Sequence, residues 1–218
     1  FTLRPHLLKG MLSISGWTMV QSFISVSIWF IFFLAIEHLG ERPLAVTNIV
    51  RNISALLIMV ISAFATTAGA LISNQIGAGE QRCLFKTCGM TLKLTYAILI
   101  PLLIILCLFP EPVLRAFTDS PSLIAASVNS VYVMASSTLI MAPSFILFNA
   151  VSGTGNTRAG FIMEMISLAV YTAVIYYGII RLKPDVALCW FSEHVYGVTL
   201  IFLAWWYLKS GKWRGKKV

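Results

Sequence analysis

Glycine-rich segments of the sequence have the residue types of a phosphate-binding loop. The segment VSGTGNTRAG, residues 151–160, places Gly153 and Gly155 beside a Thr and an Asn. A dinucleotide-binding loop has the pattern G-x-G-x-x-G after a strand, because its glycines let the backbone approach the pyrophosphate. Here the third glycine position is Arg158, and the preceding run, residues 124–150, is too long and apolar for a strand. A nucleotide site is therefore not expected.

A second segment, ISNQIGAGEQR, has a similar composition and contains Gly77 and Gly79. It also follows a long apolar run. Glycine adopts tight-turn conformations without steric cost, and it lets two helices approach closely. We therefore expect Gly77, Gly79, Gly153 and Gly155 to form turns between helices.

Polar side chains inside apolar segments are candidates for lining a substrate cavity, because a polar group in hydrocarbon must face the protein interior or water. Gln21 and Ser25 are spaced i, i+4, as are Asn48 and Asn52, so each pair shares one helix face. The alternative role is hydrogen bonding between packed helices, which uses the same side chains. The cavity candidates are Gln21, Ser25, Asn48, Arg51, Asn52 and Asn149.

Two acids are candidates for coupling to an ion. Glu164 lies inside an apolar run, where it can bind a proton or pair with Arg158 or Lys93. Glu37 ends an apolar run on the same side of the membrane as Arg51, so an ion pair between them is expected. Such a pair would act as a gate or, as we favour, neutralise a charge within the membrane.

Enzyme chemistry and metal binding are not expected from the sequence. It shows no Ser-His-Asp set, no paired carboxylates and no His cluster. The four cysteines include a C-x4-C spacing, which is not a zinc pattern, and they are expected to be small apolar fillers. We therefore expect no catalytic residue, no metal and no cofactor, with H⁺ or Na⁺ as the coupling ion of the intact protein.

The composition places these residues in a membrane. Of the 218 residues, 58% are hydrophobic and 11% charged, whereas soluble domains carry about 25% charged residues. A membrane-spanning helix needs about 20 apolar residues, and its backbone must form all its hydrogen bonds internally. The sequence therefore predicts an all-α integral membrane protein with a six-helix bundle over residues 11–209. The predicted spans are residues 12–36, 44–72, 89–109, 124–150, 160–181 and 191–208.

The distribution of Lys and Arg predicts the orientation. With six spans both termini lie on one side, and eleven of the sixteen Lys and Arg residues fall there. Basic loops stay in the cytoplasm, so we expect a multi-pass protein of the cell inner membrane with both termini cytoplasmic. Residues 1–10 are expected to form an amphipathic linker, and residues 210–218 a basic tail. The net charge of +8 lies at helix ends, so the expected partner is the lipid bilayer and not a nucleic acid.

Four segments, taken together, resemble the multidrug and toxic compound extrusion (MATE) family of transporters. LISNQIGAGE resembles the loop after the second helix of one half, and FNAVSGTGNTRAG resembles the loop between the fourth and fifth helices. LLKGMLSISGWTMVQSF is similar to the start of the first helix of the second half, and VTNIVRNISALLIMV to its second helix. Their order extends the resemblance from about Leu8 to Leu208.

The resemblance implies that the chain, which begins at Phe1, is the C-terminal half of a twelve-helix transporter. Its partner would be the missing N-terminal six-helix half. The implied function is cation-coupled efflux of drugs or xenobiotics, by proton or sodium antiport, with small organic cations as substrates. Some members bind the coupling cation with acids in the first and fourth helices of this half, but the matching positions, near Ser25, Ser137 and Met141, are not acidic. The resemblance therefore implies a coupling acid in the missing half.

Two other functions stay open. A flippase of the same superfamily for lipid-linked glycans would line its cavity with several cations for pyrophosphate, whereas Arg51 alone qualifies here. A non-transporting membrane subunit would use its polar residues only to hold helices together.

Overall fold

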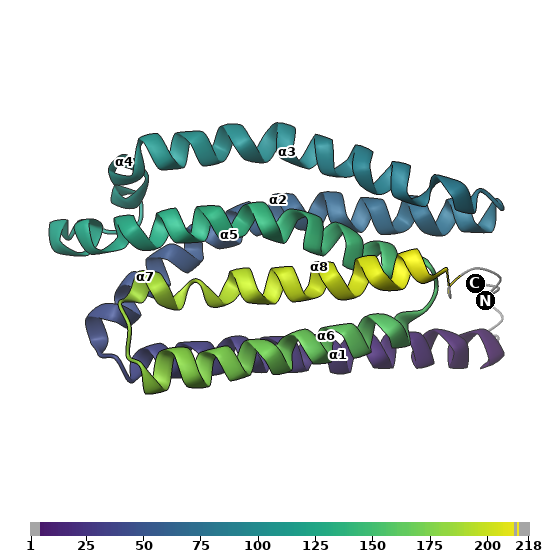
Figure 1. The fold of residues 1–218 in the computed structure, drawn as a ribbon, viewed down its shortest axis with the longest axis horizontal. Coiled ribbons are helices and arrows are strands. Elements are labelled where there is room, and N and C mark those ends of the chain that lie inside the picture. Colours follow the sequence, from purple (N-terminus) through teal and green to yellow (C-terminus); the bar gives the residue numbers. More distant parts are fainter. Residues whose placement is uncertain (1–4, 212, 214–218) are drawn as a thin grey trace.

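The computed structural model describes residues 5–211 and 213, and the side chains of residues 5–15, 17, 18 and 21 lie outside that description. The described chain consists of helical segments and contains no strand (Figure 1). The long helices are α1 (Pro5–Glu37), α2 (Glu41–Gly77), α3 (Leu84–Leu108), α5 (Pro121–Gly153), α6 (Thr157–Val174) and α8 (Ser192–Ser210). The short segments are η1 (Gln81–Cys83), α4 (Pro110–Arg115), the π-helical η2 (Ile175–Arg181) and α7 (Val186–Cys189).

The long helices match the predicted membrane spans. In the described part, five helical stretches are long and apolar enough to cross a membrane, namely Glu41–Gly77, Gln81–Leu108, Pro121–Gly153, Thr157–Arg181 and Val186–Ser210. The described apolar part of α1, Ser22–Glu37, is shorter, and α1 runs alongside the other helices (Figure 1). The prediction of an all-α six-helix membrane bundle is confirmed. Helices extend beyond the predicted apolar runs, as α2 does, because helical hydrogen bonding continues into the polar interface.

Local sequence sets the ends of the helices. Pro121 occupies the first turn of α5, where its missing N–H has no helical partner to lose. The side chain of Asn156 caps α6 by accepting a hydrogen bond from the N–H of Ala159 at 3.2 Å. Gly79 and Gly155 have φ angles of +82° and +77° in the turns that follow α2 and α5. These left-handed values favour glycine, so both glycine-rich segments form turns between membrane helices.

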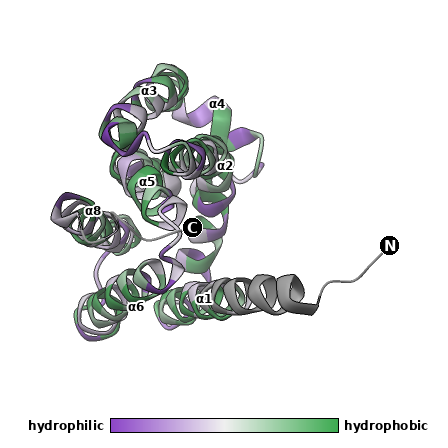
Figure 2. Ribbon diagram, turned by 90° about the vertical axis from the view of Figure 1, so that its right-hand side faces the viewer, coloured by the Kyte–Doolittle hydropathy of each residue, from purple (hydrophilic) through white to green (hydrophobic). Residues whose placement is uncertain are grey.

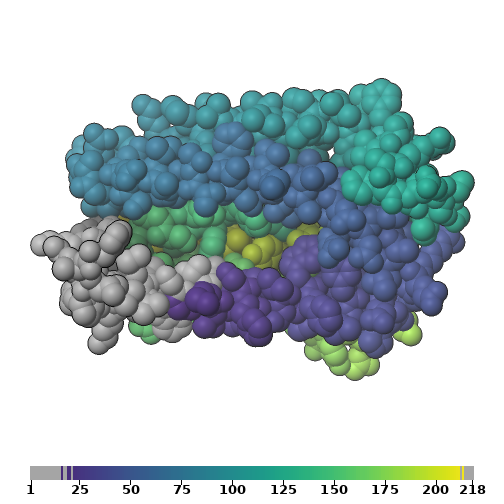
Figure 3. Space-filling model, turned by 180° about the vertical axis from the view of Figure 1, so that it is seen from behind, coloured from purple at the N-terminus to yellow at the C-terminus, as the bar shows by residue number. Residues whose placement is uncertain are grey.

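The helices form an incomplete ring. α2 packs along α5, α5 along α8, α8 along α6 and α6 along α1, while α3 and α4 cover the outside of α2 and α5 (Figure 2). α1 and α2 are neighbours in sequence but pack on each other less extensively. A hollow therefore lies between α1 and α2. Its floor is formed by parts of the chain that come later in the sequence, from α5 to α8 (Figure 3).

Three buried apolar clusters hold the ring together. The largest joins α2, α3 and α5 through residues such as Ile61, Leu99 and Val131. A second joins the other ends of α2 and α5 to α8, and a third joins α1 to η2 through Phe32 and Ile175. α1 is thus attached to the far side of the ring from α2, which explains the opening between them.

Gly69 on α2 and Gly153 at the end of α5 mark a close approach of two helix backbones. A Cβ atom added at Gly153 would lie 2.5 Å from the carbonyl oxygen of Gly69, and one added at Gly69 would lie 2.9 Å from that of Asn149. Small residues permit such contacts between membrane helices. Gly77, in contrast, has no heavy atom within 4 Å of the position its Cβ would take.

We expect Gly153→Ala to destabilise the protein and Gly77→Ala to leave its stability unchanged or slightly raised. The first methyl group collides with backbone, and overpacking of this kind costs about 1–3 kcal/mol. The second enters open space in a helix, where Ala is preferred to Gly. Thermal unfolding in detergent and the yield of folded protein measure the difference. Equal stability of the two variants would contradict the close approach of α2 and α5.

Candidate functional site

Two neighbouring cavities lie between the helices and share Phe145, Glu164 and Tyr196 in their walls. The first cavity has a volume of about 200 Å³, and its further lining residues include Ser25, Trp29, Met141, Tyr171 and Glu193. The second has a volume of about 250 Å³, and its further lining residues include Ser62, Thr66, Phe148, Asn149 and Leu200. The shared residues place Glu164 and Tyr196 at the boundary between the two spaces.

Glu164 on α6 is buried and accepts two hydrogen bonds from hydroxyl groups. Tyr196 on α8 donates to its Oε1 atom at 2.9 Å, and Ser25 on α1 donates to the same atom at 3.0 Å. The expectation that Glu164 pairs with Arg158 or Lys93 is wrong. The carboxyl group points into the bundle, where it connects three helices.

Glu193 at the start of α8 is the second buried acid. Tyr171 on α6 donates a hydrogen bond to its Oε1 atom at 2.7 Å, and only 7% of Glu193 and 3% of Tyr171 are exposed. The two pairs are reciprocal, because α6 supplies Glu164 and Tyr171 while α8 supplies Tyr196 and Glu193. The rings of Tyr171 and Tyr196 meet edge to face, with centroids 5.9 Å apart. We call these four residues the carboxyl–tyrosine cluster.

The carboxyl–tyrosine cluster has the chemistry of a cation or proton site. Among the described residues, no basic side chain forms a hydrogen bond or ion pair with Glu164 or Glu193. Intramembrane acids are costly when ionised, and they mark ion pathways and proton relays in pumps and transporters. Hydroxyl donors stabilise an ionised carboxylate only in part, so each carboxyl can take up a proton or a bound cation.

Two positions named in the resemblance also lie in the first cavity. Ser25 and Met141 occupy places where some relatives carry cation-binding acids, and both line this space beside Glu164. Ser137, the third such position, is buried in α5 and donates a hydrogen bond to the carbonyl oxygen of Met134 at 2.8 Å. The first cavity therefore does contain acids, but they come from α6 and α8 instead of α1 and α5.

The amide face predicted on α2 continues toward the second cavity. Asn48 precedes Ser62 by 14 residues and Asn52 precedes Thr66 by 14, about four helical turns, so the four residues share one side of α2. Ser62 and Thr66 line the second cavity together with Asn149 on α5. Asn48, Arg51 and Asn52 are not among the residues that line either of the two cavities. They lie farther along the same helix face.

The expected ion pair between Glu37 and Arg51 is not present among the described residues. The Arg51 guanidinium lies over the ring of Phe33 on α1, 5.1 Å from its centroid, and Glu37 is exposed at the end of α1. A cation–π contact lets the charge sit against an aromatic face without a carboxylate. Glu37 lines neither cavity. The side chain of Gln21, another predicted cavity residue, lies outside the described part of the structure.

Tyr171, Glu193 and Tyr196 are not among the site residues expected from the sequence. Glu193 begins the last apolar run, so its burial is not apparent from the sequence. A usable signal was present in the spacing, since Glu164 and Tyr171 are seven residues apart and Glu193 and Tyr196 three, so each pair shares a helix face. That signal becomes meaningful only once α6 and α8 are known to be neighbours.

The sequence matches the profile of the MatE family over residues 18–177, which is more than half of the chain. The chain therefore belongs to the MatE family of membrane transporters. Glu164 and Tyr171 fall inside the matched region, whereas Glu193 and Tyr196 follow it. A comparison with curated proteins gave no match.

Solved transporter structures share the fold. The Vibrio cholerae MATE transporter VcmN in its bent form aligns with a TM-score of 0.85 at 16% identity, over 96% of this chain and 48% of that one. An outward-facing multidrug resistance MATE transporter of the MOP superfamily aligns with a TM-score of 0.81 at 14% identity, over 94% and 46%. A MOP superfamily transporter from Pyrococcus furiosus, described by the reverse polarity of its binding pocket, aligns with a TM-score of 0.80 at 14% identity, over 91% and 44%. The chain thus spans about half the length of these transporters.

We expect Tyr196→Phe to lower the thermal stability of the protein, because Glu164 loses a buried hydrogen-bond donor. Hydrogen bonds to charged groups contribute about 1.5–3 kcal/mol, and a neutral partner gives less. Tyr177→Phe is the matched control, since Tyr177 is 66% exposed. Unfolding in detergent, followed by circular dichroism, measures both. If the two variants unfold at the same temperature, the bond between Tyr196 and Glu164 does not form in solution.

Proposed function

We propose that the chain forms the C-terminal lobe of a cation-coupled exporter of small organic cations, and that the carboxyl–tyrosine cluster takes part in coupling. The observation that carries this proposal is the position of Glu164. It is buried inside a membrane protein of a transporter family, it lines both cavities, and hydroxyl groups are its hydrogen-bond partners. A carboxyl group in such a place alternates between ion-bound and free states as a transporter cycles.

The lining of the first cavity favours positively charged ligands. Glu164 and Glu193 supply negative charge, and Trp29, Phe145 and Tyr171 supply aromatic faces. Carboxylates and aromatic rings both attract cations, including organic ammonium groups. A coupling ion and an organic cation would then compete for the same negative charge, which is the basis of antiport.

The hollow between α1 and α2 is the place for a second lobe. Transporters built from two repeats place their substrate path at the interface between the repeats, near the middle of the membrane. The hollow opens on the side of the bundle where α1 and α2 leave α5 and α8 accessible (Figure 3). An N-terminal six-helix half seated there would close the path, and the chain alone would supply one wall.

Transport of lipid-linked glycans is the second candidate function, and the cavity lining supports it less. Pyrophosphate recognition needs several cations, whereas the described cavity walls carry two acids and no Lys or Arg. A purely structural subunit is the third candidate. It would show no dependence of any transport activity on Glu164.

We expect Glu164→Gln to abolish ion-driven export while the protein still folds. The assay uses the chain joined to an N-terminal half, reconstituted in vesicles, with efflux of a fluorescent cationic dye under imposed proton or sodium gradients. Glutamine keeps the size and hydrogen bonding of the side chain but cannot carry the charge. Loss of the gradient response is expected, because intramembrane acids mark the ion pathways and proton relays of transporters.

Glu80→Gln is the control for that experiment, because Glu80 is an exposed acid in the turn after α2. It should export at the rate of the unchanged protein. The 218 residues expressed alone should not export. Gradient-driven export by Glu164→Gln at the normal rate would show that coupling occurs elsewhere, and export by the single lobe would overturn its assignment as one wall of the path.

We also propose that both termini are cytoplasmic. Turns after α2 and α5 lie at the same end of the bundle as the end of α8 (Figure 1), and the exposed cations Arg82, Arg158 and Lys209 lie there too. In a cysteine-free variant, a membrane-impermeant maleimide added to intact cells should label a cysteine at Ser120 or Pro184 and miss one at Glu80. The opposite pattern would reverse the orientation.

A further inference from the structure

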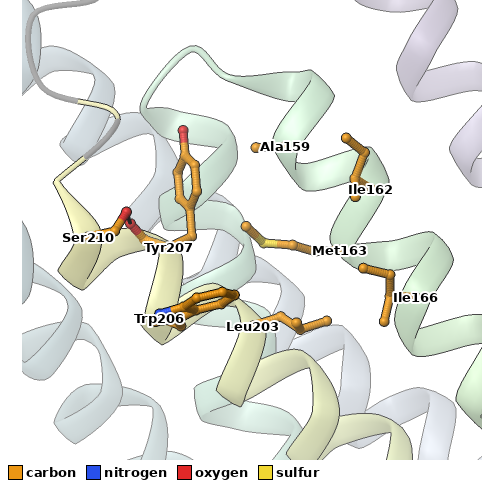
Figure 4. Close-up of a pocket in the computed structure, with 8 residues that line it drawn as sticks. All are labelled: Ala159, Ile162, Met163, Ile166, Leu203, Trp206, Tyr207 and Ser210. Atoms are coloured by element: carbon orange, nitrogen blue, oxygen red, sulfur yellow. Dashed lines mark hydrogen bonds between the residues drawn. The ribbon is translucent and has the colours of Figure 1, made fainter.

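A groove on the outer side of the bundle is separate from the two cavities. It lies between α6 and α8, near the end of the bundle where α8 finishes, and has a volume of about 360 Å³. Figure 4 shows Ala159, Ile162 and Ile166 on one wall and Leu203, Trp206 and Tyr207 on the other. In the end-on view, α6 and α8 lie on the side opposite the opening between α1 and α2 (Figure 2). A second lobe seated at that opening would leave the outer groove free.

The shape of the outer groove follows from two matching stripes of residues. On α6, Ile162 and Ile166 follow Ala159 by three and seven residues. On α8, Trp206 and Ser210 follow Leu203 by the same spacings. Since the helices are antiparallel, the small residues Ala159 and Ser210 lie at the same end and leave space there. Trp206 is 64% exposed and Ile162 47%, so the outer edges of both walls face the lipid.

The polar end of the groove is closed by protein groups. The amide nitrogen of Asn156 donates a hydrogen bond to the hydroxyl oxygen of Tyr207 at 2.6 Å. The hydroxyl of Ser210 donates to the backbone carbonyl oxygen of Tyr207 at 2.7 Å. An apolar ligand that enters from the membrane would therefore end at a polar surface, as a phospholipid does at its headgroup.

Two cations flank this polar end. Arg158 is exposed and precedes Ile162 by four residues, so it shares the lipid-facing edge of α6. Lys209 is exposed and follows Trp206 by three residues, so it shares the lipid-facing edge of α8. Its ammonium group lies over the ring of Trp205, 4.6 Å from the centroid. Trp205 does not line the groove, so Arg158 and Lys209 are two exposed cations beside its polar end, one on each helix.

We propose that the outer groove binds an anionic phospholipid, with an acyl chain between α6 and α8 and the phosphate between Arg158 and Lys209. The occupant is identified by its chemistry, because a neutral apolar ligand would not use the cations and a free anion would not use the groove. Bound lipid would hold α6 against α8. These are the two helices that carry the carboxyl–tyrosine cluster, but the lipid site does not depend on a transport function.

The test measures binding of phosphatidylglycerol and of phosphatidylcholine with the same acyl chains to the purified chain, by native mass spectrometry and thermal shift. Phosphatidylglycerol should bind one molecule per monomer and raise the unfolding temperature more than phosphatidylcholine does. In the double variant Arg158→Gln, Lys209→Gln its affinity should fall roughly tenfold or more, since each cation near a charged lipid surface contributes about one factor of five. Inorganic phosphate alone should have no effect.

The control is the double variant Arg82→Gln, Lys86→Gln, which removes two exposed cations at the same end of the bundle but outside the groove. It should keep normal affinity. A second variant, Ala159→Phe, fills the groove and should reduce lipid binding while both cations remain. Equal binding of the two lipids, or equal loss in both double variants, would overturn the site in favour of general surface attraction. Stabilisation by inorganic phosphate alone would overturn the site as well. So would a dimer that forms in the absence of lipid, because a second copy of the chain would then occupy the groove.

Discussion

The lack of hydrogen-bond partners in hydrocarbon is the constraint on which the rest of the structure depends. Every backbone N–H and C=O group within the membrane must bond inside the protein, and the long helices satisfy this requirement within themselves. Many side-chain hydroxyls follow the same rule. The hydroxyl groups of Thr91, Thr95 and Thr138 donate hydrogen bonds to carbonyl oxygens four residues earlier, so these hydroxyls are satisfied within their own helices.

The same constraint explains how the two buried acids are bonded. Glu164 and Glu193 cannot face lipid, and tyrosine hydroxyls from the opposite helix serve as their partners. Each pair links α6 to α8, so the cluster contributes to the packing of the bundle as well as to its chemistry. A site of this kind is both stable and responsive, because binding or losing a proton changes the strength of the bonds that hold two helices together.

The incomplete ring separates two surfaces with different environments. The hollow between α1 and α2 gives access to the cavity-bearing helices α5 and α8. The close contact of Gly69 and Gly153 holds α2 against α5 and so fixes one edge of that hollow. The outer groove between α6 and α8 faces lipid on the opposite side. A ligand in the groove and an ion in the carboxyl–tyrosine cluster would thus act on the same helix pair from two sides.

The sequence by itself determined the membrane environment, the six helices and the two glycine turns, because apolar length and positive φ angles are local properties. It also located Ser25, Asn149 and Glu164 as candidates, since polar residues inside apolar runs are visible in one dimension. Only the tertiary structure decided that Tyr196 and Ser25 are the hydrogen-bond partners of Glu164, that Glu193 faces Tyr171, and that Arg51 lies on Phe33 instead of pairing with Glu37. The physical reason is that partners on different helices depend on which helices are neighbours and how each is rotated about its axis. In lipid the apolar surface constrains that rotation weakly, so contacts such as that of Gly69 with Gly153 set it.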